Sequence, residues 1–140
     1  GVLYAEISAL ANDGTTRVIS ISDGTLSNRL LIFYDTTSNK VNVFAKVSNT
    51  NQAIMNFIVT DATSLNKIAV KYKLNDYSLW INGVEVDTDI SATPFTSSTL
   101  TTLSFADGNT TSSPFYGNVQ NLMVFPSALD DATLATLTTL

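Results

Sequence analysis

Hydrophobic and polar residues alternate along most of the chain, in short runs that clusters of turn-forming residues separate. Near the start, Leu3, Ala5 and Ile7 alternate with Tyr4 and Glu6. Residues two positions apart lie on the same face of a strand, so this pattern predicts nine or ten strands in an antiparallel β-sandwich or barrel. The predicted strands occupy residues 2–10, 17–23, 29–35, 41–48, 52–59, 67–73, 77–86, 100–106 and 115–125.

The pattern changes after the last predicted strand. Pro126 interrupts strand pairing, and Asp130 is a good N-cap for a helix. Leu129, Leu134 and Leu137 then form an apolar stripe with helical spacing. A helix of about two turns is marginal in isolation, so we expect it to be docked on the sandwich.

Two segments do not follow the strand pattern. Residues 87–99 contain Pro94 and are expected to be irregular. Residues 107–114 form the most polar stretch of the chain, and we expect this loop to be rigid only with help from a ligand or a neighbouring segment.

The size and composition limit the function. A chain of 140 residues is expected to form one domain, residues 1–140, and its start at Gly1, directly in a strand pattern, suggests a part of a longer protein. Charged residues make up only 14% of the sequence, well below about 25% in typical globular domains. Ser, Thr and Asn take their place, which suits secreted or virion-borne proteins and polar ligands such as sugars.

Several classes of function are excluded. The net charge is -5 and the seven Lys and Arg residues are scattered, so nucleic acid is not an expected partner. The absence of Cys and His removes thiolate and imidazole chemistry, including the usual zinc sites. No run of about 18 apolar residues is present, so membrane insertion is not expected.

Two motifs in the second half of the chain resemble the laminin G-like and pentraxin-like branch of the concanavalin A-like lectin/glucanase superfamily. The first is "LWINGV" at residues 79–84, and the second is "FYGNVQNLMVFPSALDDATLATL" at residues 115–137. The chain departs from the family pattern at Thr133, where the family has a Glu that completes a capping box. The resemblance implies an all-β jelly-roll sandwich with one short C-terminal helix.

The resemblance also implies a non-catalytic role. We expect a carbohydrate-binding or cell-surface-binding module. The composition, rich in Thr, Ser and Asn, resembles that of fibre or decoration modules of bacteriophage virions. The expected partners are therefore a cell-surface glycan or other virion proteins at the virion surface, with a homotrimer as one expected assembly. The alternative is a purely architectural virion domain that binds no sugar.

Four residues are candidates for ligand binding. Trp80 and Asn82 alternate with Leu79 and Ile81, so they are expected on the outer face of their strand, where the indole could stack on a sugar. The alternative for Trp80 is packing under the C-terminal helix or against another chain. The other two candidates, Asp107 and Asn109, lie in the polar loop, and the alternative for Asp107 is turn formation with Gly108.

The segment "EVDTD" carries Glu85, Asp87 and Asp89 at alternate positions, which in a strand would lie on one face. The spacing resembles the paired carboxylates of glucanases in the same superfamily, so a glycoside hydrolase is a third hypothesis. We expect no catalytic residues, because the segment follows the "NGV" turn of the laminin G pattern.

Calcium is the cofactor that the resemblance implies. Family members hold Ca²⁺ in rim loops through Asp and Asn oxygens, so the candidate ligands are Asp87, Asp89 and Asp107 together with Asn109. Ca²⁺ needs six to eight oxygen ligands, so the alternative is that these residues only form turns.

Overall fold

The computed structural model describes residues 1–140 as ten β-strands and one α-helix, which confirms the predicted number of strands. The run at residues 77–86 supplies two of these strands, joined by a tight turn. The bounds are β1 Val2–Ala9, β2 Arg17–Ser22, β3 Arg29–Tyr34, β4 Lys40–Val47, β5 Thr50–Ile58, β6 Asn66–Lys71, β7 Tyr77–Ile81, β8 Val84–Asp89, β9 Thr102–Ser104, β10 Gly117–Phe125 and α1 Asp131–Thr138.

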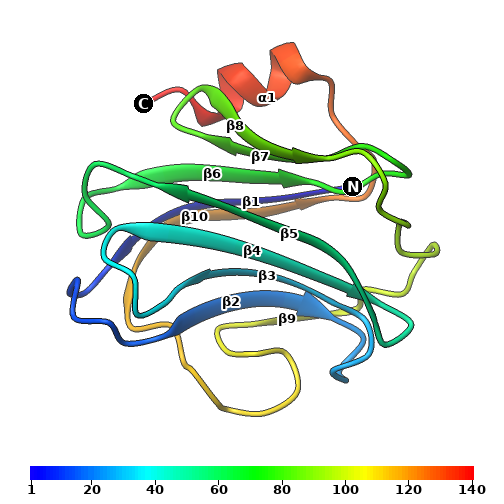
Figure 1. Cartoon of the computed structure of the whole chain (residues 1–140), viewed down its shortest axis with the longest axis horizontal. Coiled ribbons are helices and arrows are strands. Elements are labelled where there is room, and N and C mark those ends of the chain that lie inside the picture. Colours follow the sequence, from blue (N-terminus) through cyan, green and yellow to red (C-terminus); the bar gives the residue numbers. More distant parts are fainter.

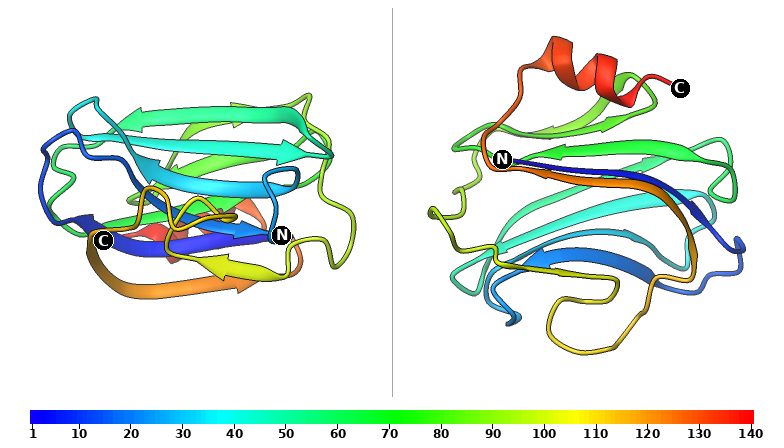
Figure 2. Two further views of the ribbon diagram at one scale, coloured as in Figure 1. Left: turned by 90° about the horizontal axis from the view of Figure 1, so that it is seen from below. Right: turned by 180° about the vertical axis from the view of Figure 1, so that it is seen from behind.

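The strands form two antiparallel five-stranded sheets that pack face to face (Figure 1). One sheet has the order β10-β1-β6-β7-β8, and the other has the order β5-β4-β3-β2-β9. We call the first the helix-side sheet, because α1 packs on it, and the second the free sheet. Figure 2 shows α1 beyond β7 and β8, on the side away from the free sheet. The predicted antiparallel β-sandwich is therefore confirmed.

The main core lies between the two sheets and contains 22 buried residues. Leu3, Ala5 and Ile7 of β1 point into it from the helix-side sheet, as their alternation predicts. Leu30 and Ile32 of β3 point into it from the free sheet. Each sheet therefore uses one face for the core and presents its other face outward.

A second, smaller core lies between the helix-side sheet and α1. Its five buried residues are Val2, Tyr4, Ala69, Trp80 and Leu134. Leu134 and Trp80 are 0% and 7% exposed, so the helix stripe and the indole close this core together. The predicted docked helix is confirmed, and with eight residues it is too short to span a membrane.

Polar contacts hold both ends of α1. At its start, the N-cap Asp130 accepts a hydrogen bond from the N–H of Thr133 at 2.8 Å, as predicted. The backbone N–H and hydroxyl of Thr133 hold the pKa of the Asp130 carboxyl below its usual range. Lys71, 7% exposed at its side chain, pairs with Asp131 at 2.9 Å and with Asp76 at 2.7 Å. The pair with Asp131 fixes the helix start to β6, and the pair with Asp76 joins the loop after β6 to the same lysine.

The Asn-Gly pair makes the predicted tight turn between β7 and β8. Asn82 and Gly83 have φ values of 51° and 89°, the left-handed conformation that this turn requires. The N–H of Gly83 donates to the Thr138 hydroxyl of α1 at 3.1 Å. The turn therefore also supports the end of the helix.

Two expectations about the irregular segments need correction or refinement. Residues 87–89 belong to β8, because pairing with β7 continues to Asp89 opposite Tyr77. The polar loop 107–114 is fixed by a neighbouring segment, since the Ser22 hydroxyl donates to the carbonyl of Gly108 at 2.9 Å. The Ser20 hydroxyl donates to the carbonyl of Ala106 at 2.7 Å in the same way. The loop therefore packs on the outer side of β2.

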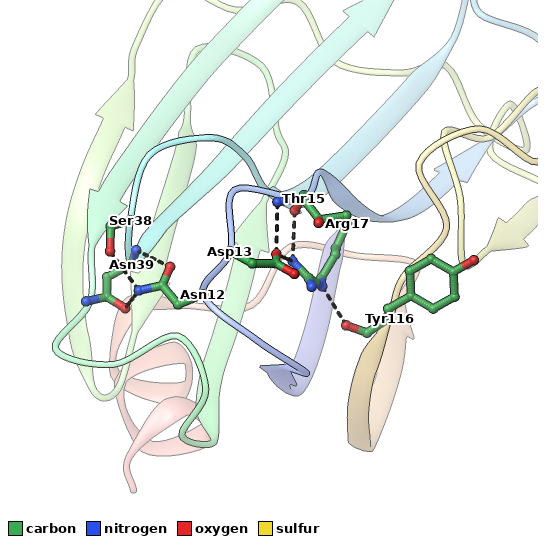
Figure 3. Close-up of polar contacts among 7 residues, drawn as sticks. All are labelled: Asn12, Asp13, Thr15, Arg17, Ser38, Asn39 and Tyr116. Atoms are coloured by element: carbon green, nitrogen blue, oxygen red, sulfur yellow. Dashed lines mark hydrogen bonds and ion pairs between the residues drawn. The ribbon is translucent and has the colours of Figure 1, made fainter.

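Loops at the end of the sandwich where β1 ends are joined by side-chain hydrogen bonds (Figure 3). Arg17 is 3% exposed, and its guanidinium donates to the carbonyl of Tyr116 and to the carboxylate of Asp13. Asn12 donates to the Ser38 hydroxyl at 2.7 Å. These contacts fix the segment that leads into β10 relative to the loop after β1.

Candidate functional site

The outer face of the free sheet is the candidate functional site. Core residues alternate with outward-facing residues along β3, β4 and β5, and α1 packs on the other sheet. We call this surface the free face. Its outward-facing residues are Arg29, Leu31, Phe33, Lys40, Asn42, Phe44, Lys46, Ile54, Asn56 and Ile58.

Strand register places these residues in cross-strand rows. In one row Phe44 lies between Leu31 and Ile54. In the next row Asn42 lies between Phe33 and Asn56. Neighbours in a row are within side-chain contact range. The centre of the free face therefore combines two aromatic rings with two amides, a mixture suited to a ligand that has both apolar and polar surfaces.

The strands of the free face carry basic but no acidic residues, although the whole protein is acidic. The strands β2, β3, β4 and β5 contain no Asp or Glu. Their basic residues on the free face are Arg29, Lys40 and Lys46, three of the seven Lys and Arg residues in the chain. A surface with several cations and no anion on its strands favours a negatively charged ligand.

Two polar atoms on the free face are buried without a hydrogen-bond partner. They are Nδ2 of Asn42, a residue only 7% exposed, and Nε of Arg29. A buried donor without a partner costs about 1–3 kcal/mol, so such groups are uncommon in folded proteins unless something else binds them. Both groups are donors at the edge and centre of the free face, and the hydroxyl of Tyr34 in the main core is a third buried polar atom without a partner.

The polar loop positions Arg29. The guanidinium carbon lies 5.7 Å from the centre of the Phe44 ring, and Nη1 donates to the carbonyl of Asp107 at 3.0 Å. Burial works to raise the pKa of the Asp107 carboxyl, but the N–H groups of Thr110 and Asn109 and the Arg29 charge hold it below its usual range. The loop therefore holds Arg29 against the edge of the free face.

Trp80 does not lie on a free surface. Its ring is 7% exposed beneath α1, and its indole N–H donates to the Ser78 hydroxyl at 3.0 Å. The prediction of a sugar platform is corrected, because Leu134 and the helix cover the ring. Trp80 instead packs under the C-terminal helix, as the alternative prediction for this residue states.

The other three predicted ligand residues make local contacts. Asn82 accepts from the N–H of Lys67 and donates to the side chain of Asn66, so its amide secures the turn. Asp107 accepts from the N–H groups of Asn109 and Thr110 within its own loop. Asn109 itself is exposed at the loop tip. Asn82 lies in the turn between β7 and β8 of the helix-side sheet. The loop that holds Asp107 and Asn109 packs on β2 of the other sheet, so the structure does not bring these residues together.

A β-bulge separates the carboxylates of the "EVDTD" segment. Glu85 pairs with Trp80, which faces α1, whereas Asp87 pairs with Leu79, which faces the main core. Glu85 and Asp87 therefore point to opposite faces of the sheet, which corrects the expectation of one shared face. Asp87 also accepts from the N–H of Asn56 on the facing sheet. The arrangement does not form the facing carboxylate pair of a glycosidase.

The predicted calcium ligands do not come together. No group of three or more Asp and Glu side chains that could hold a metal is present in residues 1–140. Asp89 accepts from the backbone and hydroxyl of Ser91, Asp87 from Asn56 and Thr88, and Asp107 from its own loop. Because Ca²⁺ needs six to eight converging oxygens, these residues do not fit a calcium site.

The free face was missed at the sequence level. Its central residues Arg29, Phe33, Asn42 and Phe44 lie on two strands, and only the register brings them together. One sequence pattern does point to it, namely the absence of Asp and Glu from residues 17–22, 29–34 and 40–58 of an acidic chain.

The two antiparallel five-stranded sheets and the docked helix define a jelly-roll β-sandwich. The family model described as the concanavalin A-like lectin/glucanases superfamily, of the laminin G type, matches residues 4–135, and the chain belongs to this superfamily. No curated protein matches the sequence.

Solved structures share the fold at low sequence identity. The CBM40 of the Ruminococcus gnavus IT-sialidase, bound to α2,3-sialyllactose, is 17% identical with a TM-score of 0.76, covering 99% of this chain and 82% of that one. The leech intramolecular trans-sialidase, complexed with 2,7-anhydro-Neu5Ac, is 18% identical with a TM-score of 0.73, covering 99% of this chain and 23% of that one. Domains LG4-5 of the mouse laminin α1 chain are 9% identical with a TM-score of 0.57, and the match covers 93% of this chain and 36% of that one.

Proposed function

We propose that this chain is a non-catalytic carbohydrate-binding module that binds a glycan on the free face. The observation that carries this proposal is the combination of Phe33 and Phe44 with the donor side chains of Arg29, Lys40 and Lys46 on the sheet face opposite the helix. Aromatic rings suit the apolar side of a sugar ring, and the donors suit its oxygens. The superfamily membership and the likeness to a carbohydrate-binding module support the same function.

The proposed ligand carries a carboxylate or another negative group. Arg29, Lys40 and Lys46 surround the aromatic centre, and the strands of the free sheet carry no opposing acid. A guanidinium binds a carboxylate through charge-assisted hydrogen bonds, which are stronger than neutral ones. The module from Ruminococcus gnavus is described as bound to α2,3-sialyllactose. This description supports a sialylated sugar as the test ligand.

Binding is tested by calorimetry with 3′-sialyllactose and, as the neutral counterpart, lactose. The wild type is expected to bind the acidic sugar more tightly. Arg29→Gln is expected to weaken this binding about tenfold, because it removes one charge-assisted contact. The matched control is Lys67→Gln, which removes a basic residue from β6 of the helix-side sheet and is expected to bind as the wild type does.

Three outcomes would count against the proposal. Equal binding of both sugars would remove the acidic preference, and equal affinity of Arg29→Gln and wild type would remove the free face as the site. If no glycan on a broad bacterial and animal array binds, with or without Ca²⁺, the architectural alternative replaces the lectin.

The biological setting is a second part of this proposal. The low charge and the Ser/Thr/Asn-rich sequence support a module of a bacteriophage fibre or decoration protein at the virion surface. Mass spectrometry of purified virions tests this setting, and absence of the chain from the particle would reject it. Size measurement in solution tests the trimer that a fibre module would form.

A further inference from the structure

We propose a second ligand site, for an uncharged sugar unit, in a pocket at the end of the sandwich where β1 begins. The segment 94–100, which connects β8 to β9, forms one wall of this pocket. Gly1 before β1, the residues after β6 and the end of β10 form the rest. Figure 1 shows these segments at the same end of the sandwich. We call it the end pocket. Its volume of about 590 Å³ is within the range of roughly 300–1,000 Å³ that holds small-molecule ligands.

An aromatic pair forms the rigid wall of the end pocket. The rings of Tyr72 and Phe95 meet edge to face, with centres 5.7 Å apart and an angle of 87°. Both rings are half-buried and pack against the main core, so their positions are fixed before a ligand arrives. Val124 continues the apolar wall and is 48% exposed, although it belongs to the inward-facing side of β10. A sugar ring has an apolar C–H face of matching character.

A turn rich in hydroxyl groups faces this wall. The N–H of Thr99 donates to the carbonyl of Thr96 at 3.2 Å, and the two threonine hydroxyls bond to each other at 2.6 Å. This leaves the exposed Ser97 and Ser98 between them at the rim. Ser98 has φ of 63°, an uncommon conformation for a residue other than glycine. The turn therefore places two short hydroxyl side chains in the lining of the same pocket as the two rings.

The end pocket has few charged groups. No Asp or Glu lines it, its one basic side chain, Lys73, lies 3.6 Å from the carboxylate of Asp76, and the amino group of Gly1 donates to the carbonyl of Tyr72 at 2.8 Å. The pocket therefore lacks the cation cluster of the free face. An uncharged hexose or N-acetylhexosamine unit, with an apolar ring face and several hydroxyls, matches the lining. This inference does not depend on the function of the free face.

The experiment follows backbone amides by NMR during titration with D-glucose, D-galactose and N-acetyl-D-glucosamine. At least one of these sugars is expected to shift the amides of residues 95–100, while amides of β3 and β4 stay in place. Phe95→Leu keeps the apolar character but removes the ring, and it is expected to weaken binding about fivefold. Phe44→Leu makes the same change on the free face and is expected to leave this binding unaltered.

Three outcomes would overturn the inference. They are no shift in residues 95–100 at millimolar concentrations of any of the three sugars, shifts confined to the free face, and equal affinity of Phe95→Leu and wild type. Because Phe95 packs on the core, Ser98→Gly serves as a second variant that removes a rim hydroxyl while accepting the left-handed backbone. It is expected to fold as the wild type does and to bind the sugar more weakly.

Discussion

The docking of α1 depends on Leu134, and its replacement by alanine is expected to destabilise the protein. Leu134 is fully buried in a core of only five residues, which includes Trp80. Removing a buried leucine side chain costs about 2–5 kcal/mol, depending on how far the site collapses. The helix has eight residues and packs on one side only, so it can move toward the cavity. We therefore expect a loss of about 2–3 kcal/mol in the free energy of unfolding.

The assay is equilibrium unfolding in urea, followed by the fluorescence of Trp80. Trp80 is the only tryptophan and touches the same small core, so its emission reports directly on helix docking. The control is Leu140→Ala, which removes the same atoms from a residue that is 71% exposed. This control is expected to change the free energy by no more than about 0.5 kcal/mol. Equal urea midpoints for the two variants would refute the described packing of α1.

Two further predictions concern polar contacts. Asn82→Ala removes both amide bonds of the turn and is expected to cost about 1–3 kcal/mol in chemical unfolding; an unchanged midpoint would contradict this role. Stability is also expected to fall as the pH drops below about 4, because hydrogen bonds hold the pKa of several aspartates below the unfolded value and protonation breaks these bonds. Thermal unfolding between pH 6 and pH 3 measures this effect, and a constant midpoint would contradict it. The aspartates concerned are Asp13, Asp23, Asp61, Asp107 and Asp130.

The fold was predictable because its determinants are local. The alternation of residues such as Leu3, Ala5 and Ile7 indicates a strand without knowledge of its partners. Asn82-Gly83 and the N-cap Asp130 specify their turn and helix start in the same local way. Local patterns therefore located the strands, the turn and the helix.

The faces of the carboxylates were not predictable, because a bulge depends on the partner strand. Strict alternation would place Glu85 and Asp87 together, and the extra residue Val86 reverses one of them. Nothing in "EVDTD" distinguishes a regular strand from a bulged one. The same limit applies to Trp80, since alternation correctly places it on the outer face but does not show that α1 covers this face.

The candidate site follows from which sheet face the helix covers. In a two-sheet sandwich both inner faces form the core, and each outer face is either covered or exposed to solvent. Here α1 covers the outer face that contains Trp80, and the apolar side chains Val2, Tyr4 and Ala69 on that face require this cover. The outer face with Arg29 has no helix on it, and the loop 107–114 covers only its β2 side, so Phe33 and Phe44 stay partly exposed. Half-buried aromatic rings beside basic side chains, on a sheet face that no helix covers, are the features that support the proposed ligand binding.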